Sequence, residues 1–185
     1  MQPPAITRQR RPFLAPLWLT LVVVLVTGGV AMTFYRSATT TVVLLVRAVE
    51  KEPGTIEDPP LSPEGEQRGQ HLAQMFGDAN GSGRLDAIYV SDERRAQQTA
   101  AALAQRLHQV PVVFSAGDAR AAAARVLREH PGGTVLVIGS GATLPQMIHE
   151  LQGVDVIPAA QGESDILYMV SIPSFGRAHL VRIRF

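Results

Sequence analysis

The pattern of apolar and polar positions divides the chain into two parts of different character. Residues 17–35 form an apolar stretch without a charged side chain, and three arginines precede it. That length is about what a helix needs to cross a hydrocarbon core. The remaining sequence alternates between short apolar runs and amphipathic segments, which is typical of a folded α/β domain. We therefore predict a basic N-terminus over residues 1–16, a transmembrane helix over 17–35 and a folded domain over 36–185.

The charges that flank the apolar stretch predict its orientation. Three arginines lie before it, whereas only Arg36 follows it closely, so the positive-inside rule places the N-terminus in the cytoplasm and the domain outside, in a periplasmic or extracellular space. A cleaved signal peptide is the alternative, because Gly29 and Ala31 supply small residues for a cleavage site. The apolar run continues through Tyr35, which favours a signal anchor over a cleaved signal.

The rest of the chain shows strands and helices in alternation. Two runs, TVVLLVR at 41–47 and TVLVI at 134–138, are apolar almost throughout, as strands buried on both faces of a parallel sheet are. Further strands are expected at 86–90, 112–114, 166–171 and 178–185, and helices at 63–76, 94–107, 119–129 and 143–151. This order predicts an α/β fold, a three-layer, doubly wound, mostly parallel sheet. In such sheets ligands bind beyond the carboxyl ends of the strands, so the loops after Arg47 and Ile138 are the expected site.

Composition and charge exclude several functional classes. The chain has no cysteine, so it cannot form a disulfide or a thiolate metal site, and its five histidines lack metal-ligand spacing. We therefore expect no metal and no cofactor. From residue 37 onwards there are 13 basic residues against 16 acidic ones, a net charge of −3, and this mildly acidic domain is not expected to bind nucleic acid.

Four segments in order resemble the histidine phosphatase superfamily, also called the phosphoglycerate-mutase-like family. They are LVRAVEK at 45–51, DPPLSPEG at 58–65, SDERRAQQTA at 91–100 and VLVIGSGATLP at 135–145. The resemblance covers residues 41–185 and implies the fold predicted above. It also implies a site for a phosphoryl group.

The resemblance further implies two histidines that this chain lacks. In the family the first strand ends in Arg-His, and that histidine accepts the phosphoryl group, whereas here Arg47 is followed by Ala48. The family's fourth strand usually ends in Gly-His, and here Ser140 follows Gly139. A methyl group has no lone pair with which to attack phosphorus. No catalytic residue is therefore expected to be intact.

The family's basic residues are retained. Arg47 and Arg95 align with two pocket arginines, and Ser140 and Gly141 lie just before a predicted helix whose N-terminus favours anions. We predict that these four residues bind phosphate. In the alternative, the two arginines only pair with nearby carboxylates, for which the candidates are Glu50, Asp92 and Glu93. The family also has a general acid that protonates the leaving group. No motif in this sequence marks that acid, and Asp118 and Glu52 are only candidates for it.

These observations favour a pseudoenzyme. We expect a membrane-anchored domain, held through residues 17–35, that binds a phosphorylated small molecule, a lipid headgroup or a protein partner without turnover. One alternative is a phosphomonoester phosphohydrolase with a rearranged mechanism, in which water attacks directly between the arginines. The other is a structural or docking domain whose pocket is filled by side chains.

Overall fold

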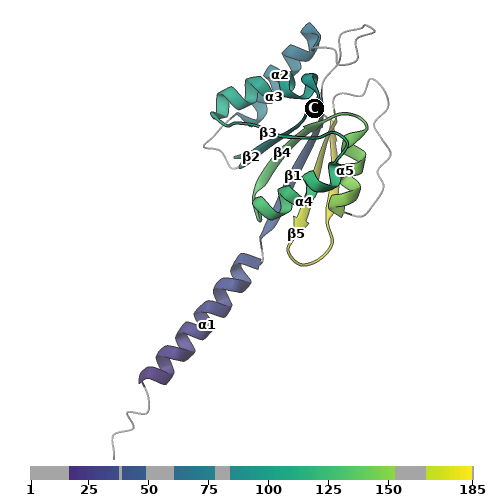
Figure 1. Cartoon of the computed structure of the whole chain (residues 1–185). Helices are drawn as coiled ribbons and strands as arrows, with labels where there is room; N and C mark the ends of the chain where they lie inside the picture. Colours follow the sequence, from purple (N-terminus) through teal and green to yellow (C-terminus); the bar gives the residue numbers. More distant parts are fainter. Residues whose placement is uncertain (1–16, 38, 49–60, 78–83, 153–165, 185) are drawn as a thin grey trace, which may run out of the picture. The chain divides into compact units, whose positions relative to one another are not determined.

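The computed structural model describes residues 17–37, 39–48, 61–77, 84–152 and 166–184. The chain consists of two compact units, and the boundary between them along the sequence falls between Ser37 and Ala38. The first contains a single described helix, α1 (Leu17–Ser37). The second contains every strand and the four remaining helices that the structure describes (Figure 1).

Helix α1 presents apolar side chains to its surroundings on every side. All side chains described in it, over residues 18–33, are exposed, including Trp18, Leu21 and Val24. Among the residues that the structure describes, no helix combines the length and the apolar character needed to cross a membrane. The structure therefore does not show the transmembrane helix expected over residues 17–35, which stays a prediction from the sequence.

The second unit is built on one six-stranded sheet with the order β3-β2-β4-β1-β5-β6. The strands are β1 (Thr40–Arg47), β2 (Ala87–Ser91), β3 (Val112–Phe114), β4 (Thr134–Gly139), β5 (Ile166–Pro173) and β6 (His179–Arg184). The β3, β2, β4 and β1 strands are parallel, whereas β5 and β6 run antiparallel to their neighbours. The apolar sequences of β1 and β4 place them at the centre, as the sequence predicts.

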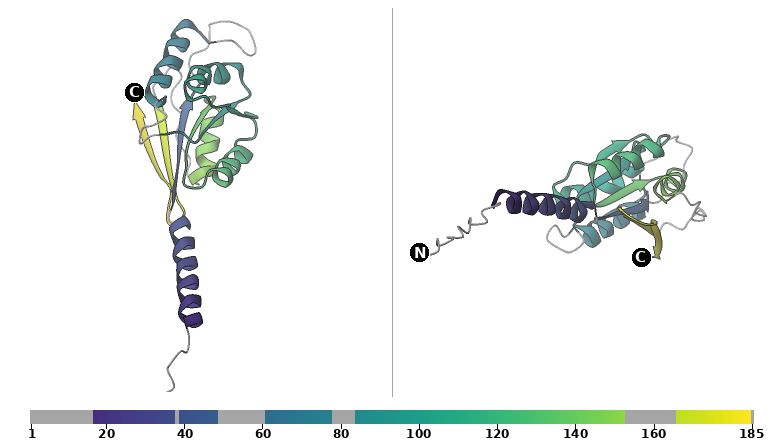
Figure 2. Two further views of the ribbon diagram at one scale, coloured as in Figure 1. Left: turned by 90° about the vertical axis from the view of Figure 1, so that its left-hand side faces the viewer. Right: turned by 90° about the horizontal axis from the view of Figure 1, so that it is seen from below.

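Helices cover both faces of this sheet (Figure 2). The helices α2 (Pro63–Phe76) and α3 (Arg94–Leu107) contribute Leu72 and Leu103 to one core, and α4 (Ala119–Glu129) and α5 (Thr143–Gln152) contribute Val126 and Met147 to the other. The α/β fold with a mostly parallel sheet is therefore confirmed. The expected ends of α2, α3, α4 and β3 agree with the structure, and the ends of the other elements differ by one or two residues.

The strand register brings three loops to one edge of the sheet. Arg47 at the end of β1 pairs with Gly139 at the end of β4, and Val90 of β2 pairs with Ile138 on the other side of β4. Ser91, the last residue of β2, therefore lies beside Gly139. The carboxyl ends of the three central parallel strands meet where the sequence places the ligand site.

Candidate anion site at the carboxyl edge of the sheet

The position after β1 holds a packed methyl group. The backbone N–H of Ala48 donates to the carbonyl oxygen of Gly139 at 2.8 Å, which continues the pairing of β1 with β4 beyond Arg47. The Ala48 side chain is buried and belongs to the core cluster beneath α2 and α3. The side chain at this position therefore contributes to packing, and it offers no group that can accept a phosphoryl.

The structure brings two of the predicted phosphate ligands together, Arg47 and Gly141. A Cβ atom built on Gly141 would lie 3.4 Å from Cζ and Nε of Arg47. The guanidinium of the half-buried Arg47 thus lies directly against the backbone of the loop between β4 and α5. A methyl group at position 141 would be in ordinary van der Waals contact with this guanidinium.

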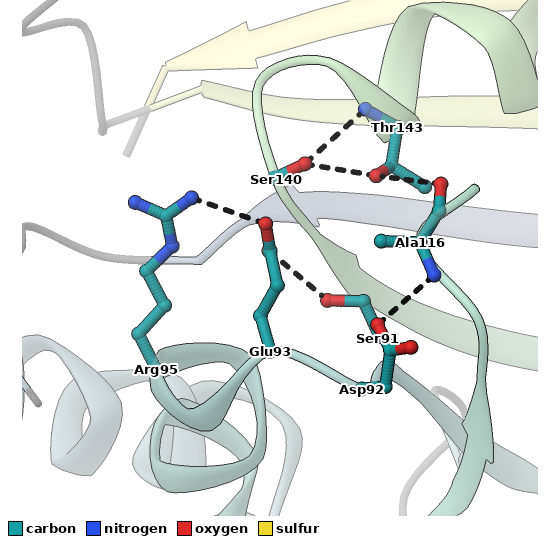
Figure 3. A network of polar contacts seen from close by, with 7 residues as sticks. All are labelled: Ser91, Asp92, Glu93, Arg95, Ala116, Ser140 and Thr143. Carbon is teal, nitrogen blue, oxygen red and sulfur yellow. Dashed lines mark hydrogen bonds and ion pairs between the residues drawn. The ribbon is translucent and has the colours of Figure 1, made fainter. Parts of the chain in front are cut away.

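Ser140, the third predicted ligand, forms hydrogen bonds with the first residue of α5. Its hydroxyl accepts a hydrogen bond from the Thr143 N–H at 3.3 Å and shares another with the Thr143 hydroxyl at 2.8 Å (Figure 3). Thr143 in turn donates to the carbonyl oxygen of Ala116 at 3.3 Å. Because that bond uses the Thr143 proton, the Ser140 hydroxyl donates its own proton to Thr143. Ser140 therefore serves as a buried helix cap that joins two loops.

Arg95, the fourth predicted ligand, already has an anionic partner. Its Nη2 lies 3.3 Å from Oε1 of Glu93, and the hydroxyl of Ser91 donates to Oε2 of the same carboxylate at 3.3 Å (Figure 3). The ion pair that the alternative interpretation expects is thus present at Arg95, with Glu93 as the partner. Asp92 does not take part in this pair, since its carboxylate accepts the N–H of Ala116 at 3.0 Å.

Glu93 is one of the three carboxylates that the sequence offers as partners of the arginines, whereas its contact with Ser91 and the contacts of Thr143 were not predicted. Glu93 occupies the N-cap position of α3, where a shorter Ser, Thr, Asp or Asn is the usual residue, and this was the available signal. Of the two acid candidates, Asp118 caps α4 by accepting the Ala121 N–H at 3.1 Å. Glu52 and the carboxylate candidate Glu50 lie outside the described residues.

A separate hollow of about 400 Å³ lies between the first turn of α4 and the first two turns of α5. Asp118, Arg120, His149 and Glu150 contribute to its lining, and Arg120 approaches Glu150 to 3.7 Å. None of the four predicted phosphate ligands lines this hollow. The loops at the carboxyl edge therefore remain the candidate site.

Solved structures of phosphate-processing proteins share this fold. The protein histidine phosphatase SixA, solved in complex with tungstate, superimposes with a TM-score of 0.61 and 18% identity, covering 77% of this chain and 96% of that one. A mycobacterial glucosyl-3-phosphoglycerate phosphatase gives 0.59 and 14%, covering 76% and 97%. Phosphoglycerate mutase from Plasmodium falciparum gives 0.57 and 15%, covering 78% and 91%. These likenesses define the class of fold.

Part of the sequence also matches a family model. The model of the histidine phosphatase superfamily (branch 1) matches residues 43–117, which run from β1 to the loop before α4. Together with the shared fold, this match supports membership of the histidine phosphatase superfamily. The comparison with curated proteins gives no match.

Proposed function

We propose that this domain binds a phosphoryl group at the carboxyl edge of its sheet and does not turn it over. The observation that carries the proposal is the buried methyl group of Ala48 at the position where the family resemblance implies the phosphoryl-accepting histidine. Arg47, held against the backbone of Gly141, supplies a planar, permanently charged donor for phosphate oxygens. Binding groups are thus present without the nucleophile that turnover requires.

The neighbouring hydroxyl does not replace that nucleophile. Ser140 stands where the resemblance implies the second histidine, and its hydroxyl both accepts a hydrogen bond from Thr143 and donates its proton to Thr143. A serine without an adjacent general base is a weak nucleophile. The alternative, a phosphohydrolase in which water attacks between the arginines, retains only positioning and charge stabilisation, and would be slow.

The ligand is proposed by the chemistry that the site recognises, a phosphoryl oxyanion. A phosphorylated small molecule, a lipid headgroup and a phosphorylated protein all carry that group. The tungstate in the SixA structure is a tetrahedral oxyanion in complex with a protein of the same fold. This likeness supports an oxyanion ligand here.

A turnover assay tests the proposal directly. The full chain in detergent is incubated with a panel of phosphomonoesters beside an Arg47→Ala variant, and the released phosphate is measured. We expect no difference between the two proteins. Turnover that disappears with Arg47 would establish the phosphohydrolase alternative instead.

A binding assay separates the anion-binding domain from a docking domain with a filled pocket. A ligand that binds only the folded state raises the unfolding temperature. We expect millimolar phosphate to raise that temperature for the unchanged chain and much less for Arg47→Ala. The absence of any shift in the unchanged chain would favour the docking domain, an interpretation that the pair between Arg95 and Glu93 makes physically reasonable.

We further propose that α1 anchors the domain to a membrane, with the N-terminus in the cytoplasm. The uncharged sequence of residues 17–35 and the exposed apolar side chains described over residues 18–33 support this. The chain has no cysteine, so single cysteines report orientation cleanly. In intact cells a membrane-impermeant maleimide should label Ser174→Cys and leave Gln2→Cys unlabelled. The reverse labelling would contradict the orientation, and a shortened, soluble product would indicate a cleaved signal.

A further inference from the structure

Glu93 stands at the N-cap position of a helix, but its carboxylate does not cap that helix. It is the N-cap residue of α3, in an extended conformation, yet its side chain makes no hydrogen bond to the N–H groups of the first helical turn. The cap therefore does not explain the carboxylate. Burial does not explain it either, because about a quarter of the side chain, 26%, is exposed.

The carboxylate instead turns toward the groups of the candidate site. One of its oxygens lies 3.3 Å from Nη2 of Arg95, and the other accepts the hydroxyl of Ser91 at 3.3 Å. Figure 3 shows Glu93 and Arg95 pointing to the side of the sheet where Ser140 begins the loop into α5. Among the described residues, Glu93 is the carboxylate in contact with Arg95. One of its oxygens thus occupies a donor of Arg95 that a bound oxyanion would otherwise use.

We propose that Glu93 is a built-in competitor for the anion site, which a phosphoryl ligand must displace from Arg95. This inference rests on the proposed function, since it assigns a specific role to a residue of the same site. A guanidinium N–H that donates to Glu93 is not available to a phosphate oxygen, and two anions beside one arginine repel each other. The apparent affinity is therefore reduced by the fraction of molecules in which Glu93 holds Arg95.

The size of the effect follows from the exposure of the pair. Both side chains are 26% exposed, and a single 3.3 Å contact of this kind is a weak ion pair that solvent screens. The competitor is consequently one that a phosphoryl group can displace. Removal of the Glu93 charge should tighten phosphate binding about fivefold at low salt, and the gain should shrink as salt screens the charges.

The test measures binding of inorganic phosphate to the full chain in detergent by titration calorimetry. Glu93→Gln keeps the size of the side chain and removes its charge, and Glu93→Ala removes the side chain altogether. Glu150→Gln is the matched control, because it removes one carboxylate from the hollow between α4 and α5, where it pairs with Arg120 rather than Arg95. We expect about fivefold tighter binding for both Glu93 variants, and a change below about twofold for the control. Adding Arg95→Ala to Glu93→Gln should abolish the gain.

The possible results separate this inference from the proposed function. Unchanged or weaker binding in both Glu93 variants, with clear binding by the unchanged chain, would overturn the role of Glu93 and leave the anion site standing. No binding by any of these proteins would overturn both. Should both variants fail to fold, the Arg95 Nε–H signal in the NMR spectrum of the unchanged chain provides the test. It must shift on addition of phosphate, and a constant signal would refute the displacement.

Discussion

At the scale of single residues, the four predicted phosphate ligands differ in what else they do. Arg47 and Gly141 are in contact with each other, and Arg95 shares Glu93 with Ser91. These three positions depend on loop contacts that a bound anion could rearrange. Ser140 differs because its hydroxyl is buried and is bonded within the loop itself.

Replacement of Ser140 should therefore affect stability more than binding. Ser140→Ala removes the acceptor for the Thr143 N–H and the partner of the Thr143 hydroxyl, so it should lower the free energy of unfolding by about 1 kcal/mol. Phosphate affinity should change little. Urea unfolding and phosphate titration of the same variant check both expectations. A stable variant with lost phosphate binding would instead make Ser140 a true ligand.

At the scale of secondary-structure elements, the close packing of α2 on α3 depends on one glycine. A Cβ atom on Gly69 would lie 3.3 Å from the backbone oxygen of Thr99. The nearest atom belongs to the backbone of α3, so it cannot swing away as the end of a flexible side chain would. The distance between the two helices is thus set by the absence of a side chain at Gly69.

A larger residue at this contact should destabilise the domain. Gly69→Val should lower the free energy of unfolding by about 1–3 kcal/mol, because the branched side chain forces α2 away from α3. Gln70→Val is the control, since it places valine at the next position, which is exposed, and tests helix propensity alone. Its cost should be below about 1 kcal/mol. Equal costs for the two variants in urea unfolding would contradict the steric explanation.

A second contact between elements joins the end of α4 to the middle of the sheet. The hydroxyl of the buried Tyr89 in β2 donates to Glu129 at 3.0 Å, and Arg125 donates to the other oxygen of that carboxylate at 2.9 Å. Hydrogen bonds from Arg125 and Tyr89 lower the pKa of Glu129. Burial, followed by its bond to Glu129, raises the pKa of Tyr89 to about 12.

The direction of the Glu129 shift predicts how its contribution to stability depends on pH. A carboxyl group whose pKa is lower in the folded state stabilises the fold at pH values above its unfolded pKa of about 4.3, and the contribution disappears as the pH falls through the folded value. Glu129→Gln should therefore be less stable than the unchanged protein at pH 7, and the difference should shrink as the pH falls below the unfolded pKa. Denaturant unfolding over a series of pH values from neutral to acid measures this. A difference that persists in acid would mean that the charge is not responsible.

The elements themselves were predictable from the sequence, and the partners of the site residues were not. The apolar runs at 41–47 and 134–138 specify buried strands, and Ser62 followed by Pro63 marks the start of α2, because these signals are local. The partner of Arg95 is decided by side-chain rotamers around Glu93 and Ser91, which carry no periodic signal. The sequence therefore limits the possible partners of Arg95 to three carboxylates, and only the structure identifies Glu93 among them.

At the scale of the whole molecule, the edge strand β6 combines apolar and charged side chains. Beyond β6, no further strand pairs with the sheet in the part of the chain that the structure describes. Apolar side chains, Val181 and Ile183, are exposed there, which would favour association between copies. Arg182 and Arg184 alternate with them, and such charges on an edge strand disfavour edge-to-edge pairing.

The two units of the chain should be separable without loss of the folded domain. Both core clusters lie wholly within residues 38–185, so this unit contains every buried contact described for the sheet and its covering helices. A chain limited to 38–185 should therefore unfold cooperatively at the same temperature as the full chain, within about 2 °C, and should need no detergent. Calorimetry of both proteins in the same detergent tests the first expectation, and sedimentation without detergent tests the second. A markedly lower unfolding temperature for 38–185 would show that the N-terminal unit stabilises the domain, whereas an unchanged temperature with lost membrane association would assign it to anchoring alone.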